Sequence, residues 1–263
     1  MVKNFQNTGY WAVIVGGSSG LGLASAKKLA EQGMNICIIY RSSRSGLEDI
    51  QHEFTQIRNE EISFLEYNVD AINNDKITET ASDLLSKIGS GNVRCLLHSV
   101  AKGNLKPMIN DASSLSTEDF QLTINAMAIN LFSWTKELVD LSLFASDARV
   151  LAFTSEGSSK AIPSYAAVSA AKAALESIMR SIAVEFAPLG IRANCIQAGV
   201  VETNSLKMIP NHEKIVKHSI NRNPFNRLTT PEDVANVVYL LCKDEASWIN
   251  GTVIIADGGE SVR

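Results

Sequence analysis

The stretch VGGSSGLGLA, residues 15–24, follows a short apolar run, WAVIV, and leads into a helical pattern at 21–32. Its glycines Gly16, Gly20 and Gly22 allow a tight turn and a close approach to a pyrophosphate, whose charge the helix N-terminal amides and dipole stabilise. Such a turn can also be purely structural. Because this one lies between a strand and a helix at the start of an alternating chain, we predict a dinucleotide site.

Beyond this stretch, short β-rich runs alternate with longer helical patterns. The runs are apolar on both faces, as expected for strands of a parallel sheet that helices cover on both sides. The sequence therefore predicts an α/β fold of one domain over 1–263, with an irregular segment at about 203–230 that is long enough to be a functional lid. The β-rich runs begin at 11, 35, 62, 93, 149, 191 and 252, and the helical patterns include 21–32, 74–88, 117–144, 164–187 and 231–242.

Composition limits the classes of function. The 263 residues are 45% hydrophobic and carry a net charge of −4, which argues against a general nucleic-acid or anionic-membrane binder. No apolar run approaches the roughly 18 residues that cross a bilayer, and the N-terminus lacks a signal-peptide pattern, so we expect a cytoplasmic protein. The four cysteines and four histidines form no ligand spacing, so we predict buried thiols and no metal site.

The end of the second β-rich run indicates which dinucleotide binds. NAD-binding proteins usually place an Asp or Glu about 20 residues after the glycines, where it holds the ribose hydroxyls. Here Arg41 lies at that distance, Ser42 follows it, and no carboxylate lies between Arg41 and Glu48. Guanidinium and hydroxyl groups favour the extra phosphate of NADPH, although Arg41 and Arg44 can also be read as solvated loop residues.

With these motifs located, the chain resembles the short-chain dehydrogenase/reductase superfamily over essentially its whole length. The glycine turn, NVD at 68–70, Asn125, a tyrosine and lysine on one helix, QAGVVET at 197–203 and DGG at 257–259 occur in the order of that superfamily. The resemblance implies a Rossmann-type, doubly wound, seven-stranded parallel sheet in the order 3-2-1-4-5-6-7. It also implies a homotetramer built through the fourth and fifth helices.

Several positions depart together from the commonest pattern. The segment at 98–101 is HSVA where most members have Asn-Asn-Ala-Gly, and Ala-Gly at 198–199 replaces Pro-Gly. Lys172 follows Tyr165 by seven positions instead of four. These departures resemble the enoyl-acyl-carrier-protein reductase branch of the superfamily, and Ser155 is closer to its NADPH-linked third type. That branch reduces a carbon–carbon double bond in the last step of the fatty-acid elongation cycle.

The spacing of Tyr165 and Lys172 affects the chemistry of the pair. In a helix, residues seven apart share a face but lie about 10 Å apart along the axis, against about 6 Å for residues four apart. The effect of Lys172 on the tyrosine is therefore weaker than in a ketoreductase, although it can still hold a cofactor ribose. Enoyl reduction mainly needs a hydrogen-bond donor at the thioester oxygen, and we expect Tyr165 to be that donor, with Ser155 in support.

The resemblance further implies which residues surround cofactor and substrate. Asn125, the fourth catalytic candidate, either holds a helix bend and a water or is a satisfied buried amide. The cofactor-binding positions are Gly16, Ser18, Ser19, Gly20, Leu21, Gly22, Arg41, Ser42, Asn68, Val69, Ser99, Val100, Ala101, Lys172, Ala198, Gly199, Val201 and Thr203. The lid residues expected to cover an acyl chain, or to pack the lid down, include Leu206, Met208, Ile209 and Ile215.

The lid is basic in an otherwise acidic chain. A basic lid beside a substrate mouth suits an acidic acyl carrier protein or a phosphopantetheine or CoA phosphate, and it can equally be a solvated amphipathic surface. Against Glu213 alone, residues 203–228 carry Lys207, Lys214, Lys217, Arg222 and Arg227.

The leading hypothesis is therefore an NADPH-dependent enoyl-thioester reductase. A carbonyl reductase, of 3-oxoacyl or specialised substrates, is the alternative enzyme. A non-catalytic NADP-binding sensor is the third possibility, against which the intact Tyr165 and Lys172 argue.

Overall fold

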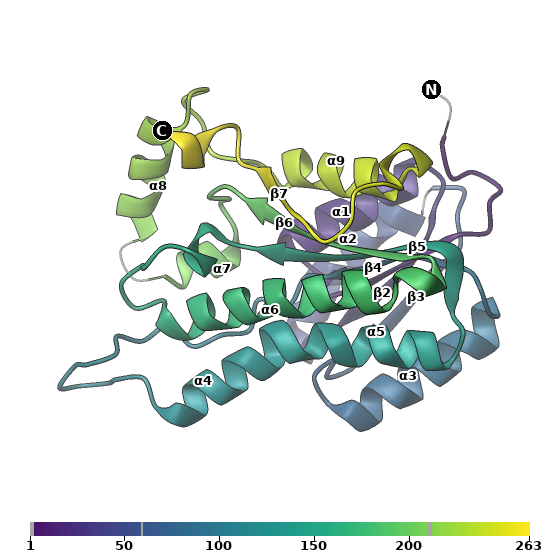
Figure 1. Cartoon of the computed structure of the whole chain (residues 1–263), viewed down its shortest axis with the longest axis horizontal. Helices are drawn as coiled ribbons and strands as arrows, with labels where there is room; N and C mark the ends of the chain where they lie inside the picture. Colours follow the sequence, from purple (N-terminus) through teal and green to yellow (C-terminus); the bar gives the residue numbers. More distant parts are fainter. Residues whose placement is uncertain (1–2, 59, 210–211) are drawn as a thin grey trace.

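The strands form one parallel sheet in the predicted order. The computed structural model describes residues 3–58, 60–209 and 212–263, and Figure 1 shows the sheet at its centre. The order is β3-β2-β1-β4-β5-β6-β7, which confirms the predicted topology. The strands are β1 (Trp11–Val15), β2 (Asn35–Tyr40), β3 (Phe64–Asn68), β4 (Val93–His98), β5 (Phe144–Thr154), β6 (Ile191–Ala198) and β7 (Val253–Ala256).

The order of the sheet reverses beside β1, which pairs with β2 on one side and β4 on the other. Val15, the last residue of β1, is level with Ile39 and with His98. A crevice opens beyond the carboxyl ends of parallel strands at such a reversal, and ligands bind there in open α/β sheets. The topology therefore places the candidate site at the ends of β1, β4, β5 and β6.

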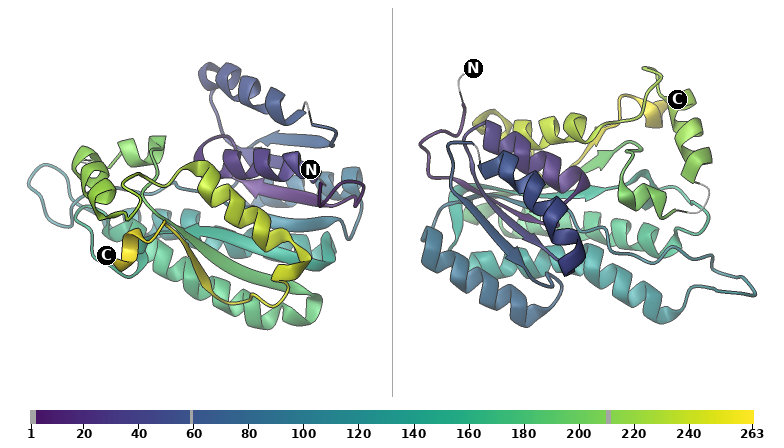
Figure 2. Two further views of the ribbon diagram at one scale, coloured as in Figure 1. Left: turned by 90° about the horizontal axis from the view of Figure 1, so that it is seen from above. Right: turned by 180° about the vertical axis from the view of Figure 1, so that it is seen from behind.

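Helices cover both faces of the sheet, as the apolar strands predict (Figure 1). One layer contains α1 (Gly20–Glu31), α2 (Leu47–Arg58) and α9 (Pro231–Cys242), whose buried side chains pack with one face of the strands. The other layer contains α3 (Asn74–Ile88), α5 (Asn130–Asp140) and α6 (Ala166–Glu185). Figure 2 shows the two layers from above and from behind. Among the described residues, no helix is both long and apolar enough to cross a membrane.

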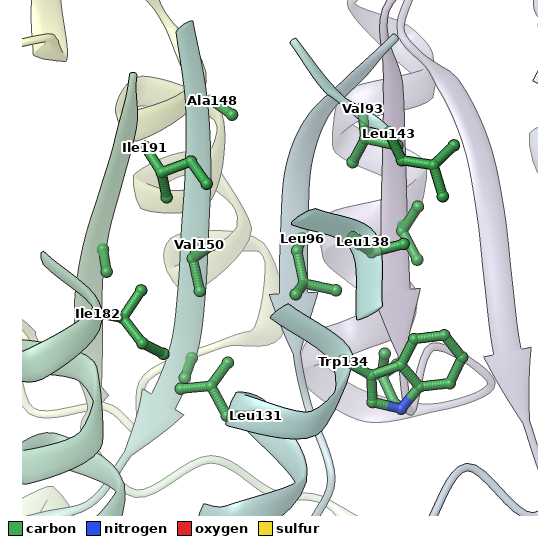
Figure 3. Packing of buried hydrophobic residues seen from close by; sticks show 14 of the residues in the cluster. Val93, Leu96, Leu131, Trp134, Leu138, Leu143, Ala148, Val150, Ile182 and Ile191 are labelled. Carbon is green, nitrogen blue, oxygen red and sulfur yellow. The ribbon is translucent and has the colours of Figure 1, made fainter. Parts of the chain in front are cut away.

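The larger hydrophobic core lies between the sheet and the layer of α3, α5 and α6. Trp134, Leu131 and Leu138 of α5 are fully buried and face Val150 and other residues of the central strands (Figure 3). Burying a large apolar side chain contributes roughly 1.5–3 kcal/mol, so this face anchors the strands whose ends form the site.

Three elements differ from the sequence predictions. Helix α2 was absent from the predicted helical patterns, because only Phe54 and Ile57 of its twelve residues are buried. The segment 203–230 is not irregular, since it contains α7 (Asn204–Lys207) and α8 (His212–Arg222), of which α8 fully buries only Ser219. Residues 210–211 of that segment lie outside the described part.

The third difference concerns the predicted helix at 117–144. It consists of α4 (Thr117–Ile124), a π-helical stretch η2 (Asn125–Ile129) and α5, and the last residue of the prediction already begins β5. A π stretch inserts residues into the helical repeat, so the apolar period runs on while the faces rotate. The spacing of apolar residues alone therefore could not show where α4 ends and the π-helical stretch begins.

Candidate active site

A large groove runs along the carboxyl edge of the sheet. Its volume is about 1840 Å³, and its wall is formed by the segments that follow β1, β2, β3, β4, β5 and β6, together with α7 and parts of α6 and α8. Predicted cofactor positions that line it are Gly16, Ser18, Ser19, Gly20, Leu21, Arg41, Ser42, Ser99, Val100, Ala101, Lys172, Ala198, Gly199, Val201 and Thr203.

The glycine turn lies where the groove is narrow. Gly16 has φ +88°, and a Cβ there would come within 2.6 Å of the Ser99 carbonyl oxygen, so a side chain is excluded. A Cβ on Gly22 would lie 2.5 Å from the Gly16 carbonyl oxygen, so this glycine lets α1 pack against the turn. Across the groove, Thr203 lies 3.5 Å from the Cβ position of Gly20. This backbone turn at a helix N-terminus fits a pyrophosphate group.

The predicted catalytic residues Tyr165 and Ser155 meet at the other end of the groove. Tyr165 is the N-cap residue of α6, and its ring packs on Gly157, where a Cβ would lie 2.8 Å from Cε1. Ser155 follows the last residue of β5 and accepts a hydrogen bond from the Gly157 amide at 3.1 Å. Burial raises the pKa of Tyr165, and a hydrogen bond with Ser155 partly opposes that rise. The phenol is thus a neutral donor at neutral pH.

Lys172 lines the groove as predicted, but a protein carbonyl also engages its ammonium group. Its Nζ donates to the Phe153 carbonyl oxygen at 2.7 Å, and the side chain is buried. Burial lowers the pKa of Lys172 to about 8, which Cys195 and Glu176 partly oppose. A lysine so placed is charged at pH 7 and titrates just above it.

His98 lies beneath this end of the groove and was not predicted as a site residue. It is the last residue of β4, and its Nε2 lies 3.2 Å from the Asn130 Oδ1. The Asn130 Nδ2 donates to the Ala71 carbonyl oxygen at 2.8 Å, so Oδ1 is the acceptor and the His98 Nε2 carries hydrogen. Burial, with the nearby Lys172 charge, lowers the pKa of His98 to about 3, so the imidazole is neutral.

The adenosine end of the groove is more exposed. Arg41 lines it, as predicted, and its Nη1 donates to the Asp70 Oδ2 at 2.5 Å. The side chains of Arg41 and Asp70 are 66% and 38% exposed. Arg44, in the short turn η1 (Arg44–Gly46), does not line the groove. One arginine is therefore available at this end, and it has a carboxylate partner.

Five predicted positions lie outside the groove wall. Asn125 is exposed at the start of η2, so the buried-amide alternative is wrong and the residue does not line the site. Asn68 uses its side chain to bond the Ser42 backbone, and Val69 packs toward the core. Met208 is 74% exposed. The fifth is Gly22, which supports the turn from behind.

Leu206, Ile209 and Ile215 do line the groove, together with residues that the sequence did not single out. Val168 is the one with a usable signal, because it lies three residues after Tyr165 and four before Lys172 on the same helical face. The others reach the groove through tertiary contacts and include Ala71, Leu105, Met127, Glu156, Ile162 and Glu260. Arg222 of the basic lid and Asp70 of the NVD motif also line it.

The charge of the lid segment is largely compensated. Arg222 pairs with Glu156 and Arg227 pairs with Asp233, while the Lys207 Nζ lies 4.0 Å from Glu202. Lys214 and Lys217 make no ion pair within the described residues. A free basic surface facing a partner is thus smaller than the sequence predicts.

The groove, its glycine turn and the Tyr165 and Lys172 side chains that line it define a nicotinamide-dependent oxidoreductase with a Rossmann-type fold. Residues 15–261 match the family described as Enoyl-(Acyl carrier protein) reductase. The chain belongs to this family, within the short-chain dehydrogenase/reductase superfamily.

Named relatives differ in substrate and coenzyme. The NADH-dependent enoyl-acyl-carrier-protein reductase FabI of Aquifex aeolicus is 31% identical over 169 residues, which span 64% of this chain and 62% of that protein. A chloroplastic NADPH-dependent aldehyde reductase-like protein of Arabidopsis thaliana is 29% identical over 94% of this chain and 93% of its own length. The solved structure of the Aquifex aeolicus NADH-dependent enoyl reductase superposes with a TM-score of 0.85 at 25% identity, covering 97% of both chains.

Proposed function

We propose that this protein reduces the carbon–carbon double bond of a trans-2-enoyl thioester, with NADPH as coenzyme. The observation that supports this best is that Tyr165 and Lys172 make different contacts. Tyr165 and Ser155 lie together at the groove, whereas the Lys172 ammonium group is engaged by the Phe153 carbonyl oxygen. A neutral, half-buried phenol suits hydrogen bonding to a thioester oxygen better than full proton transfer to a carbonyl.

The residues of the chain divide the work of such a reaction. A nicotinamide bound in the groove would supply the hydride for the β-carbon of the substrate. The electron pair of the double bond would then move toward the thioester oxygen. Tyr165 donates a hydrogen bond to that oxygen as it becomes an enolate, and Ser155 holds the phenol in place. The charged Lys172, whose Nζ donates to the Phe153 carbonyl oxygen, would hold the ribose of the coenzyme. The α-carbon takes a proton from the surroundings to complete the reduction.

Arg41 is the basis for proposing NADPH. It is the cation at the end of β2, where NAD-binding proteins place a carboxylate. Asp70, two residues beyond β3, now pairs with Arg41 and would favour ribose hydroxyls. We propose that the 2′-phosphate displaces Asp70 from the guanidinium, since an exposed ion pair is worth only about 0–1 kcal/mol.

Carbonyl reduction is the second candidate, and it has its own support. The Arabidopsis thaliana relative, an aldehyde reductase-like protein, aligns over nearly the whole of both chains. The same Tyr165 donor would then have to give its proton to an alkoxide. The weaker influence of a lysine seven residues away argues for the enoyl reaction.

Oxidation of NADPH and of NADH with three substrates tests the proposal. These are a short trans-2-enoyl thioester, the β-ketoacyl thioester of the same length and an aldehyde, with each thioester on CoA and on acyl carrier protein. We expect enoyl turnover to exceed ketoacyl turnover with NADPH. Turnover of the ketoacyl thioester or the aldehyde alone would contradict the proposal, and coenzyme binding without any turnover would indicate a sensor.

A further inference from the structure

Arg222, the last residue of α8, lies where three segments of the chain meet. Its Nη2 donates to both carboxylate oxygens of Glu156 at 3.0 Å, and its Nε donates to the Glu260 carbonyl oxygen at 2.8 Å. Figures 1 and 2 show α8 beside the C-terminal turn η6 (Glu260–Val262) in each view. The guanidinium therefore ties α8 to the end of β5 and to the C-terminus.

Both partners of Arg222 belong to the wall of the groove. Glu156 directly follows Ser155. Glu260 is 4% exposed, and its Oε2 accepts a hydrogen bond from the Val200 amide at 3.2 Å. A Cβ on Gly199 would come within 2.9 Å of the same oxygen. A movement of Arg222 would thus alter the contacts of the segment at Ser155 and of the loop after β6.

This contact is more shielded from water than other ion pairs of the segment. The side chains of Arg222 and Glu156 are 20% and 25% exposed, whereas those of Arg227 and Asp233 are 55% and 38% exposed. Partial burial opposes ionisation of Glu156, yet hydrogen bonds from Lys160 and Arg222 keep its pKa below the usual range. Charge-assisted hydrogen bonds in such surroundings are stronger than exposed pairs.

We propose that Arg222 is a positioning residue that holds α8 against the Ser155–Glu156 corner and so sets the width of the substrate end of the groove. When Arg222 withdraws, Glu156 keeps the ammonium of Lys160, and Glu260 keeps the Val200 amide. Neither carboxylate is then left without a donor. The contact can open and close without burying an unpaired charge, which suits a wall that must admit and retain a substrate.

The positioning role of Arg222 rests on the proposed function only in one respect, which is that the substrate is an enoyl thioester. We test it with Arg222→Gln and with the matched control Arg227→Gln, which removes a second arginine–carboxylate pair away from the groove wall. Loss of uniform substrate binding raises KM with little change in kcat. We expect Arg222→Gln to raise the KM of the enoyl thioester about tenfold while NADPH affinity and kcat change less than about twofold.

A double-mutant cycle with Glu156→Gln tests whether the rise in KM comes from the contact between Arg222 and Glu156. We expect Glu156→Gln to raise KM as Arg222→Gln does, and the double variant to be no worse than either single variant. Additive effects, or equal KM values for Arg222→Gln and Arg227→Gln, would overturn the proposal. A merely structural contact would lower thermal stability without this split between KM and kcat.

Hydrogen–deuterium exchange gives a readout that needs no substrate. We expect the amides of α8 to exchange faster in Arg222→Gln and in Glu156→Gln than in Arg227→Gln. Unchanged exchange would overturn the proposal even for an active enzyme. If the wild type does not reduce enoyl thioesters, the exchange experiment still decides whether Arg222 holds α8, so the two proposals fail separately.

Discussion

The two ends of the groove hold their charged groups in different environments. At the catalytic end, Lys172 is 7% exposed and its ammonium donates to a backbone carbonyl. At the adenosine end, the side chains of Arg41 and Asp70 are 66% and 38% exposed and pair mainly with each other. Charges act more strongly where water is excluded, and exposed pairs contribute little. Lys172 is therefore held by an interaction that is shielded from water, whereas Arg41, on which the proposed coenzyme choice depends, is held by a weak, solvent-screened one.

The largest expected effect is that of Tyr165→Phe. Removing the hydroxyl takes away the donor to the substrate oxygen, and loss of one such donor typically costs two or three orders of magnitude in kcat. We expect turnover to fall by about 100- to 1000-fold while NADPH affinity changes less than about threefold. Steady-state kinetics and fluorescence titration of NADPH measure the two quantities.

Tyr67→Phe is the control for that experiment. The Tyr67 hydroxyl donates to Asp83 away from the groove, so this variant should keep wild-type turnover. Equal turnover in Tyr165→Phe and wild type would show that Tyr165 takes no part in the mechanism. The contrast between the catalytic and adenosine ends of the groove would then no longer hold.

The pH dependence of kcat/KM tests the buried environment of Lys172. Burial lowers its pKa from the ordinary 10.5 to about 8, so the side chain loses its charge as pH rises past that value. We expect kcat/KM of the free enzyme to fall about tenfold per pH unit above the midpoint. Lys172→Met should lack this limb as well as most of the activity. A profile that stays flat to pH 10 would contradict the assignment.

The lowered pKa of Lys172 also makes the free energy of unfolding depend on pH. Between pH 8 and 10.5 the unfolded chain keeps the Lys172 proton while the folded chain loses it. The unfolded state then binds more protons, so this group makes the free energy of unfolding rise with pH across that window. The free energy of unfolding of the wild type, measured by chemical denaturation relative to Lys172→Met, should therefore rise as pH increases from 8 to 10.5.

The site residues that the sequence predicts correctly are those that form a local pattern. The glycine turn at 15–24 and the pair Tyr165 and Lys172 are encoded by neighbours along one strand, turn or helix, and the structure places them at the groove. Asn125 does not line the groove, because the π stretch that begins there rotates the helix faces. The contact of Arg222 with Glu156 joins residues 66 apart in the chain, so no local period could indicate it.

A smaller effect is expected from Arg41→Ala at the exposed end. Loss of a guanidinium that binds the 2′-phosphate should raise the KM of NADPH about tenfold and leave that of NADH nearly unchanged. Arg44→Ala is the matched control, because Arg44 is a neighbouring arginine outside the groove wall. If the two variants behave alike, or if NADH is the better coenzyme of the wild type, the proposed role of Arg41 is wrong.

The smallest expected effect comes from Asp70→Asn, which removes the carboxylate that competes for Arg41 while keeping its size. The exposed pair is worth at most about 1 kcal/mol, so freeing the guanidinium should lower the KM of NADPH only about two- to fourfold. Salt screens such charges, so the gain should shrink as ionic strength rises. Measurement of NADPH and NADH kinetics at low and high salt checks both points. A large gain that does not depend on salt would mean that this end of the groove is as shielded as the other.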